Sequence, residues 1–364
     1  MTFGRNFLPG PTGVHPDLLA AMTAPMFAHY TPAMRPYLED VQPALREMFG
    51  TERPVFSLTC SGTGLLESAI RNGVRERVLV VDSGFFGAYF ATIAERCGKE
   101  VIRIQVPLGQ TLEAEQLEAL LDGPEVDAVA LVHSESSAGS LAPLETLAPV
   151  VRRRPDTMLL VDAISSAAAT PIEMDRLGID FVVAGSQKAM ALPPGLAFGA
   201  ASDRLEARAR SLPNVGHYFS VTRWVRMAAE YDLFETPALS LHFALHRQIQ
   251  RIAESGGWAA RWSRHQALSG HFAEWAAQQP GVEMLARPGR RSPAVSVIRL
   301  TGGQNPELIA GQLAAQGFLV GRSIDNTHGP LLRIGHMGDI ELHHLDDLLA
   351  ALTPLLSSSS GGDH

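Results

Sequence analysis

The sequence predicts an α/β fold in which a mostly parallel sheet forms a large domain and a smaller α+β domain follows. Three observations support this prediction. Short apolar runs alternate with helical patterns between about residues 78 and 199, the pair Gly256–Gly257 interrupts this order, and helices and strands in a different order follow. Strands that alternate with helices of this length are typical of a parallel sheet covered on both faces.

The chain before residue 240 divides into an arm and a large domain. Proline and glycine are frequent in residues 7–13, so we expect 1–15 to form an extended N-terminal arm. The large domain is expected over 16–240. Its expected elements are helices at 16–22, 37–49, 88–97, 112–121 and 144–153, strands at 78–81, 101–104, 128–132, 158–161 and 180–184, and an edge strand at 196–199.

The remainder of the chain is expected to form a smaller unit. A helical pattern over about 238–253 predicts a bridge between the domains, with the connecting helix placed at 241–255 and the small C-terminal domain at 256–354. Its expected elements are helices to about 279, at 307–316 and at 340–354, and strands at 295–300, 318–321 and 331–334. Residues 355–364 are low in complexity and are expected to form a disordered tail.

Composition narrows the classes of function. The 364 residues are 46% hydrophobic and carry a formal net charge of −8, which argues against nucleic acid or an anionic membrane as the main partner. No apolar stretch approaches the length of a membrane span, and no apolar leader opens the chain. The two cysteines, Cys60 and Cys97, form no C-x-x-C motif, which fits a reducing cytoplasm. No clustered metal-ligand spacing is present, so we expect no metal site.

A lysine and an aspartate follow two of the predicted strands. Lys188 comes after the apolar run at 180–184, and Asp162 ends the run at 158–161. Both would lie at the carboxyl ends of a parallel sheet, where open α/β folds bind ligands. Pyridoxal 5′-phosphate (PLP) chemistry needs this pair, a lysine for the Schiff base and a carboxylate for the pyridinium nitrogen. Taken singly, Lys188 could be a surface lysine and Asp162 a helix N-cap.

A candidate phosphate site precedes the first predicted strand. Ser61, Gly62 and Thr63 open a helical pattern with an apolar face. The free N–H groups and the dipole of a helix N-terminus bind anions readily, and the two hydroxyl groups can add donors. The segment matches neither a Walker A motif nor G-x-G-x-x-G, and an ordinary capped helix start is the alternative.

Two further segments supply groups for a flat ring. Phe86 stands between two glycines directly after the strand at 78–81, where an aromatic side chain can stack on a pyridine ring. Its neighbour Phe85 could instead be a hydrophobic contact under the next helix. The hydroxyl-rich segment 133–139 follows the strand at 128–132, so one of its hydroxyl groups can bind the phenolic oxygen of the ring.

The order of these motifs resembles that of a known family. The chain is similar to the class V aminotransferases of the fold-type I PLP enzymes, specifically the alanine–glyoxylate and serine–glyoxylate (serine–pyruvate) branch. The resemblance covers about residues 7–354 and implies a sheet of the seven-stranded type. The matching segments are 8–11 (LPGP), 60–63 (CSGT), 84–87 (GFFG), 133–139 (HSESSAG), 161–163 (VDA), 185–189 (GSQKA), 235–237 (ETP) and 332–338 (LRIGHMG).

The resemblance implies a role for each matching residue. Lys188 would form the Schiff base and carry protons, and Asp162 would pair with the pyridinium nitrogen. Arg333 would bind the substrate α-carboxylate, which suits the planar guanidinium fork. Thr236 would reach the phosphate of the neighbouring subunit, because the family's active sites lie at a dimer interface. Other cofactor contacts would come from Ser61, Gly62, Thr63 and Gln187 at the phosphate, Ser136 at the phenolic oxygen and Phe86 on the ring.

Two positions depart from the family pattern. Tyr30 stands where the family often has an arginine after a histidine near the N-terminus. Leu233 and Phe234 occupy the region where the family often has a tyrosine shortly before the interface threonine. Both departures concern the substrate pocket or the second subunit, so they bear on the amino donor more than on the cofactor.

The expected function is a PLP-dependent aminotransferase that acts as a homodimer with shared active sites. The resemblance implies transfer of an amino group from a small α-amino acid, alanine or serine, to glyoxylate or pyruvate. A PLP lyase acting on a small amino acid and a non-catalytic α/β binding subunit are the alternatives. A desulfurase is disfavoured, because Cys60 precedes the phosphate segment and Cys97 lies in a predicted helix rather than on a loop.

Overall fold

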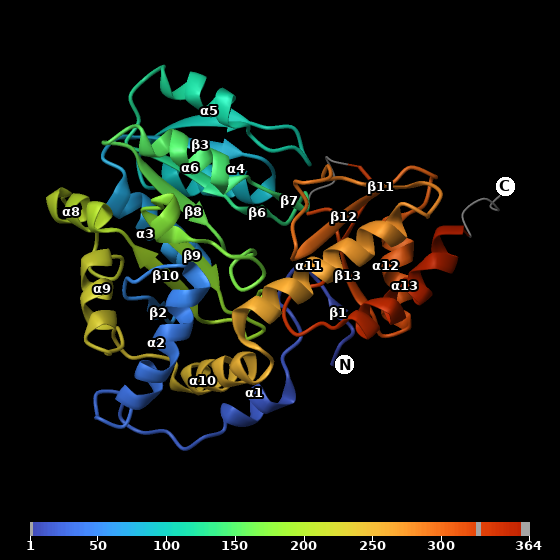
Figure 1. Ribbon diagram of the computed structural model, residues 1–364, viewed down its shortest axis with the longest axis horizontal. Coiled ribbons are helices and arrows are strands. Elements are labelled where there is room, and N and C mark those ends of the chain that lie inside the picture. Colours follow the sequence, from blue (N-terminus) through green and yellow to red (C-terminus); the bar gives the residue numbers. More distant parts are fainter. Residues whose placement is uncertain (1–2, 325–328, 358–364) are drawn as a thin grey trace.

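The large sheet lies at the centre of one part of the molecule. A computed structural model describes residues 3–324 and 329–357 and places a seven-stranded sheet beside a five-stranded one (Figure 1). The larger sheet has the order β2-β10-β9-β8-β5-β3-β4, and all its strands are parallel except β10. This arrangement confirms the predicted fold class. The strands are β2 (Phe56–Leu58), β3 (Arg77–Asp82), β4 (Glu100–Gln105), β5 (Ala128–Val132), β8 (Met158–Asp162), β9 (Phe181–Gly185) and β10 (Ala197–Ala201).

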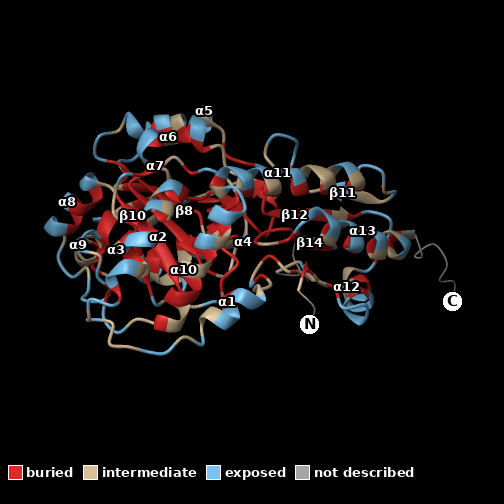
Figure 2. Ribbon diagram, turned by 60° about the horizontal axis from the view of Figure 1, so that its bottom comes forward, coloured by how far each residue is buried: buried red, intermediate tan, exposed pale blue. Residues whose placement is uncertain are grey.

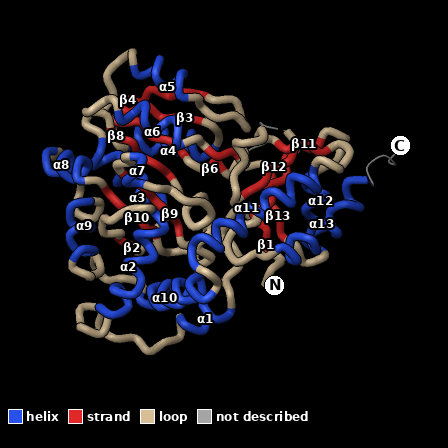
Figure 3. Tube along the Cα trace, in the orientation of Figure 1, coloured by secondary structure: helices blue, strands red, loops and turns tan. Residues whose placement is uncertain are grey.

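Helices cover both faces of this sheet (Figure 1), and the colouring by secondary structure in Figure 3 distinguishes them from the strands. Successive side chains of a strand point to opposite faces, so Leu159 and Val161 of β8 join one apolar core and Leu160 joins the other. Apart from the edge strand β4, the strands of this sheet are therefore mostly buried (Figure 2). The helices are α1 (Pro16–Ala21), α2 (Arg35–Phe49), α3 (Gly62–Gly73), α4 (Phe85–Arg96), α5 (Ala114–Leu121), α6 (Leu144–Arg152), α7 (Met174–Leu177), α8 (Asp203–Ser211), α9 (Val221–Ala229) and α10 (Leu239–Glu254).

The expected edge strand at 196–199 is wrong in one respect. β10 forms there, but it lies inside the sheet, between β9 and β2. The true edge is β2, only three residues long and directly followed by polar residues, so its pattern gave no strand signal. Gly199 of β10 makes room for this edge, since a Cβ at that position would lie 2.6 Å from the ring of Phe56.

The smaller sheet combines the two ends of the chain. β1 (Asn6–Phe7), from the expected arm, pairs in parallel with β13, so the sheet has the order β1-β13-β14-β12-β11. Phe7 is fully buried in the core of this sheet with Leu268 and Phe272. The other elements are β11 (Val282–Met284), β12 (Val295–Leu300), β13 (Leu319–Arg322), β14 (Leu331–Gly335), α11 (Gly257–Ala276), α12 (Pro306–Ala315) and α13 (Leu342–Ser357), and a short hairpin is formed by β6 (Ser134–Glu135) and β7 (Ser140–Leu141).

The last helix is longer than the sequence suggested. α13 continues to Ser357, so residues 355–357, expected in the tail, are helical, because Leu356 still packs into the core of the small sheet. Residues 358–364, the rest of the expected disordered tail, lie outside the described residues. None of the helices in the described ranges has both the length and the apolar character needed to cross a membrane.

Two glycines hold the arm against the small sheet. A Cβ at Gly335 would overlap the carbonyl oxygen of Leu8, and a Cβ at Gly321 would lie 2.9 Å from the ring of Pro9. The close approach of backbone to backbone here leaves no room for a side chain. The arm is thereby seated on β13 and β14, and it continues from there toward the carboxyl ends of the large sheet.

We expect Gly335→Ala to lower the free energy of unfolding by about 1–3 kcal/mol, because the added methyl group must push the arm away. Urea denaturation measures the change. Gly311→Ala is the control, since Gly311 is an exposed residue of α12 with open space around it. That change removes a poor helix former and should raise stability by up to about 1 kcal/mol. Equal stability of Gly335→Ala and the wild type would show that the arm is not held at this point.

Candidate active site

Lys188 lies in a turn that follows β9, at the carboxyl edge of the large sheet. Its Nζ donates a hydrogen bond to the carbonyl oxygen of Pro9 in the arm and lies 5.9 Å from the centre of the Phe86 ring. Burial lowers the pKa of Lys188 to about 8, assisted by the charge of Arg333 and opposed by the nearby carboxylates. More of this amine is therefore unprotonated, and hence nucleophilic, near neutral pH than in a solvent-exposed lysine.

Asp162 ends the neighbouring strand at the same edge. It is opposite Val132 of β5 and Val183 of β9 in the strand register, and its side chain is buried. One carboxylate oxygen accepts the backbone N–H of Ile164 at 2.8 Å. Burial, together with the charge of Glu135, raises the pKa of Asp162 to about 7. A cationic partner at this place would favour the charged carboxylate, and a protonated ring nitrogen is such a partner.

The candidate phosphate site is the N-terminus of α3. Ser61 is the N-cap residue, but its hydroxyl group makes no capping hydrogen bond and remains available. A Cβ at Gly62 would overlap the side chain of Ile164, so the loop packs tightly beside the strand exit that carries Asp162. A Cβ at Gly185 would lie 3.2 Å from the same Ile164 and 3.0 Å from Oε1 of Gln187. The N-terminus of α3 and the end of β9 thus both pack against Ile164, which follows β8.

Glu135 is a functional candidate that sequence reasoning did not assign. This buried carboxylate accepts the backbone N–H groups of Phe86 at 3.1 Å and Gly87 at 3.0 Å, and both the N–H and the hydroxyl of Ser137. It satisfies the first turn of α4, which explains why this helix begins at Phe85 and not at the expected residue 88. The signal available in the sequence was one acidic residue in a run of small hydroxyl residues after a buried strand.

Ser136 has an unused hydroxyl group. Its Oγ is fully buried and has no hydrogen-bond partner among the described residues. A buried polar atom without a partner is costly and indicates that a group absent from the protein chain completes the site. An oxygen acceptor on a bound cofactor would satisfy this hydroxyl group.

Arg333 reaches the same place from the small sheet. It lies on β14, where its Nε donates to the carbonyl oxygen of Arg322 at 2.6 Å and its Nη1 contacts the carbonyl oxygen of Ser136 at 3.5 Å. It makes no ion pair with a carboxylate anywhere in the described ranges. Burial lowers the pKa of Arg333, and the charge of Glu135 opposes this shift. A partly buried guanidinium without a paired carboxylate is suited to bind a carboxylate ligand.

One sequence candidate, Thr236, is not brought to the lysine within one chain. Thr236 is exposed in the loop before α10, and Tyr30, the position that departs from the family pattern, is 80% exposed. The nearest link of this loop to the phosphate segment is the hydrogen bond from the N–H of Ala238 to Oγ1 of Thr59 at 2.9 Å. The expected contact of Thr236 was with a neighbouring subunit, which a single chain does not contain. It stays a prediction.

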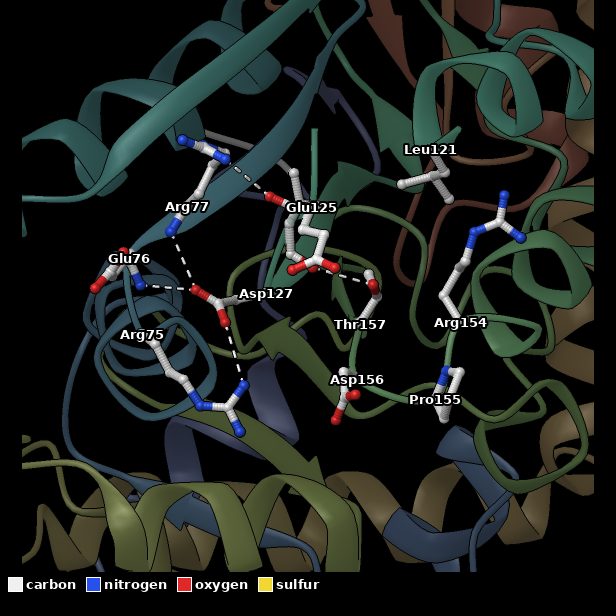
Figure 4. A pocket seen from close by; sticks show the side chains of 11 residues that line it. Arg75, Glu76, Arg77, Leu121, Glu125, Asp127, Arg154, Pro155, Asp156 and Thr157 are labelled. Carbon is white, nitrogen blue, oxygen red and sulfur yellow. Dashed lines mark hydrogen bonds and ion pairs between the residues drawn. The ribbon is translucent and has the colours of Figure 1, made fainter. Parts of the chain in front are cut away.

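A charged hollow of about 500 Å³ lies at the opposite, amino edge of the large sheet (Figure 4). Among its lining residues, Arg75 forms an ion pair with Asp127, and Arg77 donates a hydrogen bond to the carbonyl oxygen of Glu125. It contains none of the groups described above, and we assign no chemistry to it. Across the described residues, no group of three or more His, Cys, Asp or Glu side chains is placed to hold a metal ion.

The groups at the carboxyl edge fit PLP. The site offers an amine of lowered pKa, a buried carboxylate for a ring nitrogen, an orphaned hydroxyl at Ser136 and a helix N-terminus for a phosphate. Each requirement of the cofactor is thus met by a different element: the turn after β9, β8, the turn between β6 and β7, and α3.

Comparisons with known proteins agree with this fit. The profile described as Aminotransferase class-V matches residues 51–323. The chain is 32% identical to an uncharacterized aminotransferase of Methanocaldococcus jannaschii, over 91% of this chain and 87% of that protein. It is 30% identical to the L-aspartate–glyoxylate aminotransferase of Paracoccus denitrificans, over 92% and 86%. The crystal structure of an alanine–glyoxylate aminotransferase from Nostoc sp. superposes with a TM-score of 0.91 at 27% identity, over 98% of this chain and 96% of that one. This chain therefore belongs to the class V aminotransferases, a family of PLP-dependent enzymes.

Proposed function

We propose that this aminotransferase moves an amino group from a small α-amino acid, alanine or serine, to glyoxylate or pyruvate. The observation that carries the proposal is the proximity of Lys188 and Arg333, a base and a guanidinium that has no carboxylate partner among the described residues and comes from the other sheet. Two of the similar proteins described above carry glyoxylate in their names, which supports glyoxylate as acceptor. Their donors differ, being aspartate in one and alanine in the other.

Five groups would hold the cofactor. We assign the phosphate to the N-terminus of α3, with Ser61, Gly62 and Thr63, and to Gln187. Asp162 holds the proton on the ring nitrogen, and the hydroxyl of Ser136 donates to the phenolic oxygen. Phe86, whose backbone N–H is held by Glu135, would stack on the ring. When bound, PLP supplies a protonated ring that accepts the electron pair released at the substrate α-carbon.

Lys188 is assigned the proton transfer. With PLP bound, the Nζ of Lys188 would be the base that takes up the proton of the substrate α-carbon and the acid that later gives it back. The lowered pKa of about 8 suits this role, because a base is most effective when its pKa lies near the working pH.

The arm supports a small substrate. A Cβ at Gly10 would lie 2.6–2.8 Å from the outer atoms of the Lys188 side chain, and Pro9 accepts the lysine hydrogen bond. The arm therefore lies directly against the reactive lysine and leaves little room beside it. Alanine and serine fit such a space better than donors with long side chains.

We also propose that the enzyme works as a homodimer in which Thr236 approaches the phosphate of the partner. Exposed aromatic side chains support an interface, namely Tyr30, Phe85, Tyr89 and Tyr218. The two free cysteines, Cys60 and Cys97, support the expected cytoplasmic location, which cell fractionation would check.

If each active site needs both subunits, the affinity for PLP should depend on the protein concentration. If Thr236 completes the partner's phosphate site, dilution below the dimer dissociation constant should weaken PLP binding, and Thr236→Val should weaken it without dissociating the dimer. Sedimentation velocity and fluorescence titration of PLP measure the two properties. A monomer with full activity at assay concentration rules out the shared site.

The amino donor can be tested by a half-reaction screen that also tests Lys188. With PLP-loaded enzyme and no keto acid, alanine or serine should produce pyridoxamine phosphate faster than aspartate does. Lys188→Ala should produce none on this time scale, because the proton carrier is missing. Lys99→Ala is a matched control, since Lys99 is the only other lysine of the chain and binds the carbonyl of Arg75 on the surface. Turnover by Lys188→Ala at the rate of Lys99→Ala would refute the assignment.

Arg333→Lys tests the class of substrate. Lysine keeps the positive charge but loses the two-pronged geometry, so catalytic efficiency should fall for every α-amino acid alike, by about 1–3 kcal/mol of transition-state binding. An amine without a carboxylate should be affected little. A variant with normal kinetics and a lower melting temperature would make Arg333 a structural residue instead.

A further inference from the structure

The turn that carries Lys188 is held by donors from three other segments. The backbone N–H of Thr12 donates to the carbonyl oxygen of Gln187 at 3.0 Å. The hydroxyl group of Thr12 donates to the carbonyl oxygen of Lys188 at 3.3 Å. Gln248 of α10 donates to the carbonyl oxygen of Met190 at 2.8 Å. The fourth carbonyl, that of Ala189, is occupied by an arginine of α11. Four successive carbonyl groups around the reactive lysine are thus fixed from outside the turn.

That arginine is Arg261, whose side chain is only 5% exposed. Both Nε, at 3.2 Å, and Nη2 donate to the Ala189 carbonyl oxygen, while Nη1 donates to Asp339 at 2.9 Å. Asp339 also accepts from Gln248 at 3.3 Å, so one carboxylate supports both side chains that hold the turn. Burial would raise the pKa of Asp339, but the charges of Arg261, Arg264 and Arg251 and the hydrogen bond from Arg261 lower it.

The backbone of this turn is strained at one residue, so it depends on these hydrogen bonds. Ala191 adopts φ of 56°, a left-handed conformation that costs a non-glycine residue about 1–3 kcal/mol and persists only where the surroundings enforce it. Removing one of the outside donors would let the turn relax toward an unstrained conformation. The side chain of Lys188, which lies within two residues of every held carbonyl, would then lose its fixed direction.

The position of Asp339 connects this support to the substrate. Asp339 follows Arg333 by six residues, on the segment that leaves β14. The proposed carboxylate-binding residue and the carboxylate that orients Arg261 therefore belong to one continuous stretch of chain. The small sheet and the segment after it thus contribute both Arg333, which would bind the substrate, and Asp339, which supports the lysine turn.

We propose that Arg261, oriented by Asp339, is a positioning residue that fixes the Ala189 carbonyl and so aims the amine of Lys188 at the cofactor. This inference rests on the proposed function, in which Lys188 is the cofactor lysine. Arg261 touches neither the cofactor site nor Lys188 Nζ, and it acts through the backbone of the turn.

The chain provides a matched control for Arg261. Arg208 of α8 is equally buried, with 5% exposure, and donates to the carbonyl oxygens of Gly73 at 3.1 Å, Asp127 at 3.0 Å and Asp156 at 2.6 Å. These carbonyls lie at the amino edge of the sheet, far from Lys188. Arg208→Met and Arg261→Met should therefore lower the stability of the protein by similar amounts. Only Arg261→Met should change the pKa of Lys188 and its reaction with PLP.

The first measurement is the pKa of Lys188 in the full-length chain before PLP is added. Labelling with acetic anhydride over a range of pH, followed by mass spectrometry, gives this value, with Lys99 as an internal reference in the same sample. The groups that face Lys188 are Asp162, Glu135 and Arg333, which remain in all variants. Since burial is the main cause of the lowered pKa, relaxation of the turn in Arg261→Met should raise it by about one unit.

The second measurement uses the holoenzyme. In Arg261→Met a smaller share of bound PLP should be trapped on Lys188 by borohydride, and kcat should fall at least about tenfold, while KM for the amino acid stays within about twofold. Arg208→Met should match the wild type in all three. Arg261→Lys, which keeps one donor for the Ala189 carbonyl, should recover part of the loss.

The outcomes separate the inference from the proposed function. If the wild type itself traps no PLP on Lys188, the proposed function fails. Suppose instead that the wild type traps PLP on Lys188, and that Arg261→Met has the same Lys188 pKa, the same share of trapped PLP and the same kinetic constants. Arg261 then only stabilises the fold, and the inference is overturned. Should Arg261→Met not fold, Asp339→Asn replaces it, because it loosens Arg261 with little change of shape. A Lys188 pKa in Asp339→Asn equal to that of the wild type overturns the inference in the same way.

Discussion

The parallel pairing of β8 with β9 is the contact on which the site depends. Both strands are buried on both faces, so their sequences are apolar throughout and a polar side chain can appear only where each strand ends. Parallel strands end at the same edge, and this brings Asp162 and the turn of Lys188 into one place. The loop of Gly62 packs against Ile164 at that edge, which adds a helix N-terminus to the two ionisable groups.

The electrostatics of the site follow from burying four ionisable groups together. Lys188 and Arg333 bring two positive charges, and Asp162 and Glu135 bring two negative ones, so the charges balance before any ligand is present. Burial still penalises each charged form, which lowers the pKa of the lysine and raises that of the aspartate toward one another. Glu135 differs from Asp162 in that four hydrogen bonds from the start of α4 and Ser137 already occupy it.

The small sheet takes part in the site as much as the large one. It contributes Arg333 directly, and it seats the arm so that Pro9 and Gly10 lie over the lysine. Through Asp339 and Arg261 it also holds the backbone next to Lys188. A site assembled in this way has its carboxylate-binding group and its base on different elements that are joined by buried polar contacts, so their separation is set by those contacts.

The sequence by itself determined the fold class, the family and the strand exits that carry Lys188 and Asp162, because alternating apolar runs and polar strand ends are local patterns. It also singled out Arg333, Phe86 and Ser136 through short motifs. Only the tertiary structure decided that β2 and not β10 is the edge, that Glu135 fixes α4, and that Pro9, Arg261 and Asp339 converge on the lysine turn. These contacts join residues far apart in the chain, for example Arg261 with Ala189 and Lys188 with Pro9, and no local period or motif encodes such a meeting. They arise when the two sheets pack, because buried donors and carbonyl groups must then find partners.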